Sequence, residues 1–258
     1  MHSSSALNTA SSTNRSVLEE TKGSLENRSP RQSGYLLFLA MLYLTVMLCS
    51  GVLTHRLIQL GPFYTMAGTL VAPLWFTLSD VIAEIYGYTV ARRLVWFGFI
   101  CQTIFAIICK LLVELPSPDF LDNQTAYFTV LDSILYTCLS ALVAYIFAGF
   151  INIYLISKWK ILLMGRYFWL RSLGASTISE LIFTVLAVFF IQVGKLPLKQ
   201  MLTIMAVSYS LKVIYAILLA LPANLLTYVI KKTDGIDIYD YKTNYNPFYM
   251  LRNNSLSK

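Results

Sequence analysis

Long apolar stretches alternate with short polar connections along most of the chain. Each stretch has about 20 residues or more, the length that an α-helix needs to cross a ~30 Å hydrocarbon core at ~1.5 Å per residue. Strands of a membrane barrel would show ~10 residues of alternating polarity instead, and a helix pairs its own backbone groups within the lipid. We therefore expect helices over six stretches: Leu36–Ile58, Pro62–Tyr86, Leu94–Val113, Ile134–Ile156, Phe168–Val193 and Met201–Ile230.

The expected fold is an all-α integral membrane protein, a bundle of about six transmembrane helices. Residues 1–33 are rich in Ser, Asn and charged residues and have no hydrophobic periodicity, so we expect a disordered N-terminal tail. Residues 34–232 would form the six-helix membrane domain, and residues 233–258 a cytoplasmic C-terminal tail.

Basic residues gather in alternate connections between the stretches. The third connection carries Glu114, Asp119 and Asp122 and has no Lys or Arg. Lys and Arg favour the cytoplasmic side of a membrane, so six crossings would place both termini in the cytoplasm. The basic residues on that side would be Arg15, Lys22, Arg28, Arg31, Arg92, Arg93, Lys158, Lys160, Arg166, Lys231 and Lys232.

Composition agrees with a membrane protein and narrows its chemistry. Charged residues make up 13% of the chain, about half the ~25% of soluble domains. The net charge of +7 could indicate nucleic acid, but the charges lie in short loops, so we expect a lipid bilayer as partner and no nucleic acid. The two histidines and four cysteines form no metal-binding or catalytic motif, so we expect no enzyme, no metal and no cofactor.

Two acidic residues on the second predicted helix need an explanation, because a charge near mid-membrane costs ~2.5–3.5 kcal/mol or more. Asp80 and Glu84 are four residues apart and share one helix face. We interpret Glu84 as an interfacial partner of Arg92 and Arg93, whereas Asp80 is deep enough to favour a functional role. Arg171, in the first turn of the fifth predicted helix, is expected to extend to the membrane interface.

Glu180 and Lys212 lie at similar depths in the fifth and sixth predicted helices. Antiparallel neighbours would bring them together, either as a structural ion pair or as part of a binding site or proton relay. Asp80 and Glu180 could carry a proton, although Lys212 would oppose this. Polar neighbours on the same faces are Ser176, Thr184 and Ser208.

The block from Pro73 to Gly87 (PLWFTLSDVIAEIYG), followed by Ala91-Arg92-Arg93, resembles the bacterial queuosine-precursor transporter family, also catalogued as a vitamin uptake transporter family. The resemblance extends over about residues 35–232. Its further matches are Ala144-Tyr145 through Asn152, Arg171, Ala175-Ser176-Thr177, Glu180, Lys212-Val213 and Pro222.

The resemblance implies an inner-membrane importer of queuosine precursors, 7-cyano- or 7-aminomethyl-7-deazaguanine, for tRNA modification. A carboxylate could accept the two adjacent N–H donors of such a base, and aromatic rings could stack on it at ~1–3 kcal/mol each. The substrate-binding or proton-relay candidates are Asp80, Glu84, Asn152, Ser176, Thr177, Glu180 and Lys212. The stacking candidates are Trp75, Phe76 and Tyr209, and the interfacial charges are Arg92, Arg93 and Arg171.

The chain departs from the family pattern at three positions. Members often have Asp where this chain has Asn152, another Asp near Phe183-Thr184, and a lysine late in the first helix where this chain has Arg56. These losses weaken a carboxylate-relay mechanism unless Glu180 compensates for them. An alternative function is the substrate-binding membrane subunit of a partner-energised vitamin transporter. A membrane enzyme would need a paired-Asp, Ser/His or metal site, and none is visible. Nothing in the pattern indicates an oligomeric state.

Overall fold

The computed structural model describes residues 29–54, 56–116, 128, 130–131, 134–241 and 243–249. It divides into two units, residues 1–38 and 39–258. The first unit is described only from Ser29, where α2 (Ser29–Leu53) begins seven residues before the expected Leu36. The rest of the predicted tail, and Asp119 and Asp122 of the acidic connection, lie outside the described residues. All contacts below belong to the second unit.

Five helices are long and apolar enough to cross a membrane: α2, α3 (Ala72–Val113), α5 (Ile134–Leu162), α6 (Phe168–Gln192) and α7 (Leu198–Asp234). Large apolar side chains on their outer faces are exposed, among them Phe97, Ile104 and Leu111 on α3. A soluble domain rarely exposes so much continuous apolar surface. The expected class, an all-α membrane protein, is therefore confirmed.

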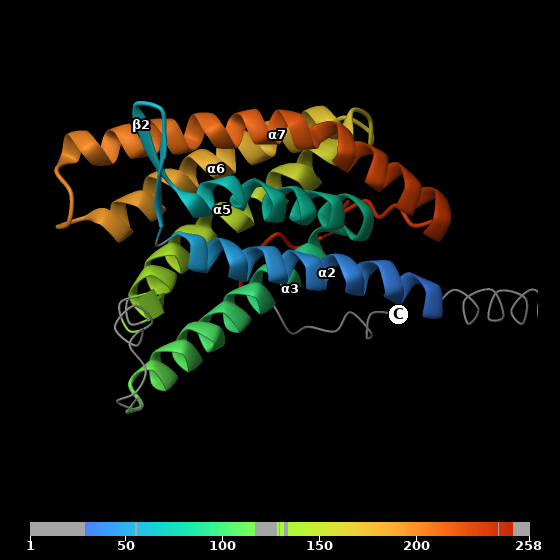
Figure 1. The fold of residues 1–258 in the computed structure, drawn as a ribbon. Helices are drawn as coiled ribbons and strands as arrows, with labels where there is room; N and C mark the ends of the chain where they lie inside the picture. Colours follow the sequence, from blue (N-terminus) through green and yellow to red (C-terminus); the bar gives the residue numbers. More distant parts are fainter. Residues whose placement is uncertain are drawn as a thin grey trace, which may run out of the picture. The chain divides into compact units, whose positions relative to one another are not determined.

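Helix α3 holds two of the expected stretches, joined at Gly87. Gly87 has φ 81° and ψ 172°, a backbone conformation that residues with a Cβ rarely adopt. Residues 72–86 and 88–113 are thus separate helical segments, and Figure 1 shows α3 turning sharply between its teal and green parts. The helix end expected at Gly87 is confirmed.

The predicted end of the first helix, Ile58, and the predicted start of the second, Pro62, are both wrong. Helix α2 ends at Leu53, and residues 57–66 form a two-stranded antiparallel hairpin, β1 (Leu57–Leu60) and β2 (Phe63–Met66), followed by the 3-10 turn η1 (Ala67–Leu70). Gly61 takes φ 61° and Pro62 follows it, a pair that favours a tight turn. We call the end of the bundle that carries this hairpin the hairpin end.

The opposite end is covered by residues 235–241 and 243–249, which we call the tail segment. The backbone N–H of Ile238 donates to the carbonyl of Ile85 at 3.2 Å, and the Asp240 carboxylate accepts from the backbone N–H of Tyr88 at 2.9 Å. The tail segment therefore supplies a donor to a backbone carbonyl at the end of residues 72–86 of α3. It also supplies an acceptor to the first backbone N–H of residues 88–113. We call this the tail end. Between the two ends, α5 packs on α3 and α6, and α7 packs on α3 and α6.

Candidate functional site

Asp80 lies in the interior of the bundle and is fully buried. Its Oδ2 accepts hydrogen bonds from Ser172 Oγ at 2.6 Å and Ser176 Oγ at 2.8 Å, and its Oδ1 accepts one from Asn152 Nδ2. Three helices thus meet at one carboxylate, because Asn152 comes from α5 and the serines from α6. Asp80 is held by these donors and does not line a described cavity.

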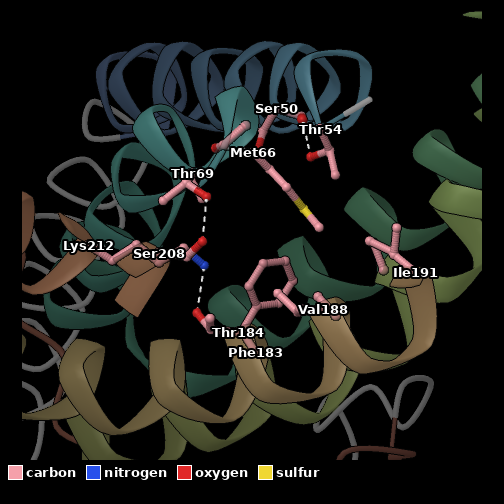
Figure 2. Close-up of a pocket in the computed structure, with 14 residues that line it drawn as sticks. Ser50, Thr54, Met66, Thr69, Phe183, Thr184, Val188, Ile191, Ser208 and Lys212 are labelled. Atoms are coloured by element: carbon pink, nitrogen blue, oxygen red, sulfur yellow. Dashed lines mark hydrogen bonds between the residues drawn. The ribbon is translucent and has the colours of Figure 1, made fainter. Parts of the chain in front are cut away.

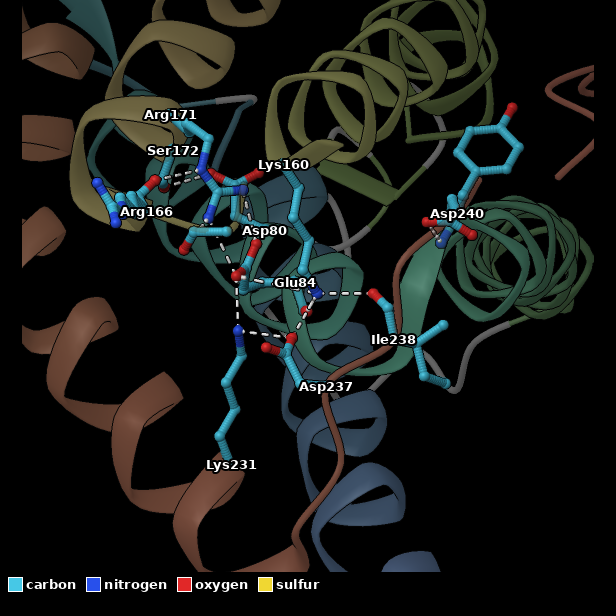
Figure 3. Close-up of polar contacts among 12 residues, drawn as sticks. Asp80, Glu84, Lys160, Arg166, Arg171, Ser172, Lys231, Asp237, Ile238 and Asp240 are labelled. Atoms are coloured by element: carbon cyan, nitrogen blue, oxygen red, sulfur yellow. Dashed lines mark hydrogen bonds and ion pairs between the residues drawn. The ribbon is translucent and has the colours of Figure 1, made fainter. Parts of the chain in front are cut away.

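Glu84, one turn further along α3, is the centre of a buried ion-pair cluster (Figure 3). Arg171 donates two hydrogen bonds to its carboxylate, at 2.8 and 3.1 Å. Lys231 of α7 donates a third at 2.7 Å, and Lys160 of α5 lies 4.0 Å away. Glu84 and Arg171 are both nearly inaccessible to solvent, so this cluster joins α3, α5, α6 and α7 at the tail end.

The tail segment completes this cluster. Lys160 Nζ donates to the carbonyls of Glu84 and Ile238 and to Asp237 Oδ1, each at 2.6 Å, and Lys231 pairs with the same Asp237 oxygen at 2.8 Å. Partial burial would raise the pKa of Asp237, but the hydrogen bonds from Lys160 and Lys231 outweigh it and hold the pKa below its ordinary value. The tail segment is thereby tied to three helices.

A polar cavity lies at the hairpin end between α2, η1, α6 and α7 (Figure 2). Lys212 enters it from α7 and donates to Thr184 Oγ1 at 2.9 Å. Ser208 lies one turn before Lys212 on the same helix, and its hydroxyl is 2.8 Å from that of Thr65 and 3.4 Å from that of Thr69. The cavity has a volume of about 40 Å³, which is enough for one or a few water molecules. The remaining lining is Ser50, Thr54, Met66, Gly68, Ala72, Ala141, Phe183, Ala187, Val188 and Ile191.

A second small cavity adjoins the first and has an aromatic wall. Phe183 lines both, and Trp75 and Tyr145 line the second. The Trp75 ring lies 5.6 Å from that of Phe183 and 5.3 Å from that of Tyr145, centroid to centroid, and it stacks on Phe76 at 3.8 Å. Lys212 Nζ lies 4.5 Å from the centroid of the Phe183 ring. We call these two adjoining spaces, with Lys212 between polar and aromatic walls, the Lys212 cavity.

Glu180 lies between the Lys212 cavity and Asp80. It is fully buried, and neither of its carboxylate oxygens has a hydrogen-bond partner in the described part of the chain. Thr184, one turn further along α6, bonds Lys212 instead. The ion pair expected between Glu180 and Lys212 is therefore not made within 4.0 Å.

A larger cavity of about 300 Å³ opens at the tail end. Glu84 and Lys231 form its polar side, and Tyr167, Phe168 and Trp169 at the start of α6 form an aromatic side. Thr227 also lines it, and the Thr227 hydroxyl has no partner among the residues described. Polar space therefore exists at both ends of the bundle, with Asp80 and Glu180 between them.

Two interpretations of the basic residues were wrong. Arg92 does not pair with Glu84, since its guanidinium donates to the carbonyls of Asn244 and Asn246 at 3.0 and 2.9 Å, and Arg93 is exposed. Arg171 does not extend to an interface, because it is 1% exposed and bonded to Glu84.

Other expected site residues lie apart from the cavities. Thr177 bonds the carbonyl of Leu173 in its own helix. Tyr209 is half-buried and lines neither part of the Lys212 cavity. Of the stacking candidates, Trp75 lines the cavity and Phe76 supports it from behind.

Several residues of the site went unrecognised in the sequence. Lys160 was interpreted only as a basic residue of a cytoplasmic loop, yet it is 1% exposed. No sequence pattern in the tail segment indicated that Asp237 and Asp240 would bind the helices. Thr65 and Thr69 lay inside what looked like a continuous apolar helix. Their signal was available, because two hydroxyl residues four apart beside a Gly-Pro pair are unusual in a membrane-spanning stretch.

These features define a multipass α-helical membrane protein with a polar interior. In the described part of the chain, no group of His, Cys, Asp and Glu side chains could hold a metal ion. Residues 66–227 match the profile of a family described as "Putative vitamin uptake transporter". A Bacillus subtilis (strain 168) protein named "Probable queuosine precursor transporter" is 29% identical over 167 residues, which cover 64% of this chain and 72% of that protein. No solved structure matches the chain.

The family match covers more than half of the chain, so the chain belongs to the vitamin uptake transporter family. It is a multipass membrane transporter. The matched residues include all of α3, α5 and α6 and most of α7, and they exclude the tail segment.

Proposed function

We propose that this chain imports queuosine precursors, 7-cyano- or 7-aminomethyl-7-deazaguanine, across the bacterial inner membrane for tRNA modification. Family membership and the name of the Bacillus subtilis relative support this substrate class. The substrate would be a small planar heterocycle, and the chain would act as a transporter and not as an enzyme.

The observation that carries the proposal is the Lys212 cavity. A 7-deazaguanine base has two flat faces, one carbonyl acceptor and several N–H donors. Trp75 and Phe183 offer rings for stacking, Lys212 offers a charged donor for the carbonyl, and the hydroxyls of Thr69 and Ser208, which line the cavity, can accept or donate. This pairing of an aromatic wall with a polar wall is suited to a heterocyclic base.

Recognition through Lys212 replaces the carboxylate recognition expected for Asp80 and Glu180. The oxygens of Asp80 already accept three hydrogen bonds. Neither carboxylate is among the residues that line the cavity. We therefore assign Asp80 to holding α3, α5 and α6 together beneath the site.

The cavity is too small for a base as it stands, since ligand pockets are typically ~300–1,000 Å³. Movement of α7 or the hairpin against α6 would widen it, as alternating access requires. We further propose six crossings, with the two halves of α3 counted separately. The tail end, where Lys160, Lys231 and Lys232 gather, would then be cytoplasmic.

A bacterium that cannot make queuosine and lacks its own importer provides the test. We expect this chain to restore queuosine in tRNA at low external 7-cyano-7-deazaguanine. Lys212→Met should lower uptake about 10- to 100-fold, because a hydrogen bond to a charged group contributes ~1.5–3 kcal/mol. Lys199→Met, at an exposed lysine on the same helix, is the matched control and should leave uptake intact. Equal uptake by both variants would rule out the Lys212 cavity as the site.

A further inference from the structure

Glu180 is a buried carboxyl group for which the substrate site has no direct use. It lies in the middle of α6, twelve residues from Phe168, and is fully buried. No donor among the described residues reaches either of its oxygens. An ionised carboxylate is strongly disfavoured in an apolar interior without donors or a paired charge. In this conformation Glu180 therefore carries its proton.

Among the described residues, the charged groups that interact with Glu180 come from two helices, Asp80 from α3 and Lys212 from α7. Asp80 is held by its three donors, and a second anion there disfavours ionisation of Glu180. The two lysines of α5 are engaged at the tail end, Lys158 over the Tyr245 ring and Lys160 with Asp237. Lys212 is therefore the one cation in the described part of the chain placed to stabilise ionised Glu180.

Lys212 cannot donate to the substrate and pair with the Glu180 carboxylate in the same conformation. In the structure it points into the cavity and bonds Thr184 (Figure 2). Glu180 is left without a hydrogen-bond partner among the described residues. If Lys212 turns to Glu180, the pair is stable only when Glu180 has lost its proton. Occupation of the cavity by a substrate that takes the Lys212 hydrogen bond thus favours protonated Glu180, and the two binding events are linked.

We propose that Glu180 is the proton-binding group of this transporter and that a proton crosses the membrane together with the substrate. This inference rests on the proposed import function. On the outer side, an O–H bond forms as the Glu180 carboxylate takes a proton from water, and Lys212 turns to the substrate. On the cytoplasmic side the substrate leaves, Lys212 returns to Glu180, and the O–H bond breaks as the proton passes to water.

The path for the proton is a column of polar side chains through the apolar bundle. Thr184 and Lys212 connect Glu180 to the cavity at the hairpin end. On the other side of Glu180, Asp80 is followed one turn later by Glu84, which lines the 300 Å³ cavity at the tail end. Thr184 and Glu180 share one face of α6, and Asp80 and Glu84 share one face of α3. The step from Glu180 to Asp80 crosses from α6 to α3. The column therefore joins both ends of the bundle with Glu180 near its middle.

Liposomes that contain only the purified full-length chain test the proposal, with labelled 7-cyano-7-deazaguanine as probe. Equal potassium and valinomycin on both sides hold the membrane potential at zero. With the outside more acidic by one pH unit, coupling to a proton allows accumulation approaching about tenfold, since a tenfold gradient corresponds to ~1.4 kcal/mol. Glu180→Gln should reduce this accumulation to equilibrium. Glu114→Gln, an exposed carboxylate paired with Lys110, should accumulate like the wild type.

A second readout needs no variant. Probe added outside wild-type liposomes at equal pH should make the external medium more alkaline, because protons enter with it. Normal probe exchange without alkalinisation or accumulation would overturn proton coupling and leave the import function standing. Accumulation by Glu180→Gln would also overturn the assignment of Glu180. If the wild-type chain exchanges no probe at all, the import function fails and the coupling proposal falls with it.

Discussion

Replacing Glu84 with Gln removes the carboxylate on which three cations converge. Arg171 and Lys231 lie 2.8 and 2.7 Å from its oxygens, and Lys160 lies at 4.0 Å. Glutamine has nearly the same volume, so the change removes charge without creating a cavity. Lys160 and Lys231 would keep Asp237 as a partner, whereas Arg171 would keep only the backbone carbonyls of Arg166 and Gly165.

The expected cost follows from burial. Glu84 and the Arg171 side chain are each 0% exposed, and removing one partner of a buried pair costs ~3–5 kcal/mol because the other charge stays buried and unpaired. Asp237→Asn is the matched control. The Asp237 side chain is 40% exposed, so solvent screens its pairs and its loss should cost only about 1 kcal/mol or less.

A denaturant titration of the purified chain in detergent measures the free energy of unfolding of each variant. A protein of ordinary stability, ~5–15 kcal/mol, would lose a large part of it in Glu84→Gln and little in Asp237→Asn. The double variant Glu84→Gln/Arg171→Met should recover part of the loss, because it removes the cation left without a partner. Equal costs for the two single variants, or a Glu84→Gln cost below about 1 kcal/mol, would refute this reasoning.

Three further predictions concern the tail segment and its contacts with the helices. Gly87→Ala should destabilise the fold by ~1–3 kcal/mol, because φ is 81° and a Cβ would meet Ile238 Cγ2 at 3.0 Å; an unchanged melting temperature would contradict this. Asp240→Ala should cost ~1–2 kcal/mol by uncapping the Tyr88 N–H, whereas Asp240→Asn, which keeps an acceptor, should cost less; equal melting temperatures for the two variants would count against the cap. Since the pKa of folded Asp237 lies below its ordinary 3.8, its ionised form stabilises the fold above about pH 4, and this contribution disappears as the pH falls through the folded pKa. Melting curves between pH 6 and 3 should show the wild type and Asp237→Asn converging on acidification, and a constant difference would contradict the assignment.

Helix positions and the break at Gly87 could be predicted from the sequence, because length and apolar character alone identify membrane-spanning helices. The face shared by Asp80 and Glu84 also followed from helical periodicity. The hairpin could not be predicted the same way. Its residues are as apolar as a helix, and only the Gly61-Pro62 pair distinguishes it.

The partners of the buried charges depended on helix packing, which periodicity does not specify. Glu84 has Arg92 close by in sequence, but the kink at Gly87 turns Arg92 toward the tail segment. Arg171, 87 residues away, takes its place. Lys160 looked like a loop charge because its partner Asp237 lies in a polar tail without a recognisable pattern. Lys212 does reach α6 one turn from Glu180, yet it bonds the Thr184 hydroxyl there instead of the carboxylate.

The most direct test of the central claim is uptake of labelled 7-cyano-7-deazaguanine by liposomes that contain the purified chain and no other protein. The account predicts uptake well above that of empty liposomes, about 10- to 100-fold slower for Lys212→Met and unchanged for Lys199→Met. Uptake by the chain alone would also exclude a requirement for an energising partner subunit. A folded wild-type chain that takes up no more than empty liposomes would contradict the claim.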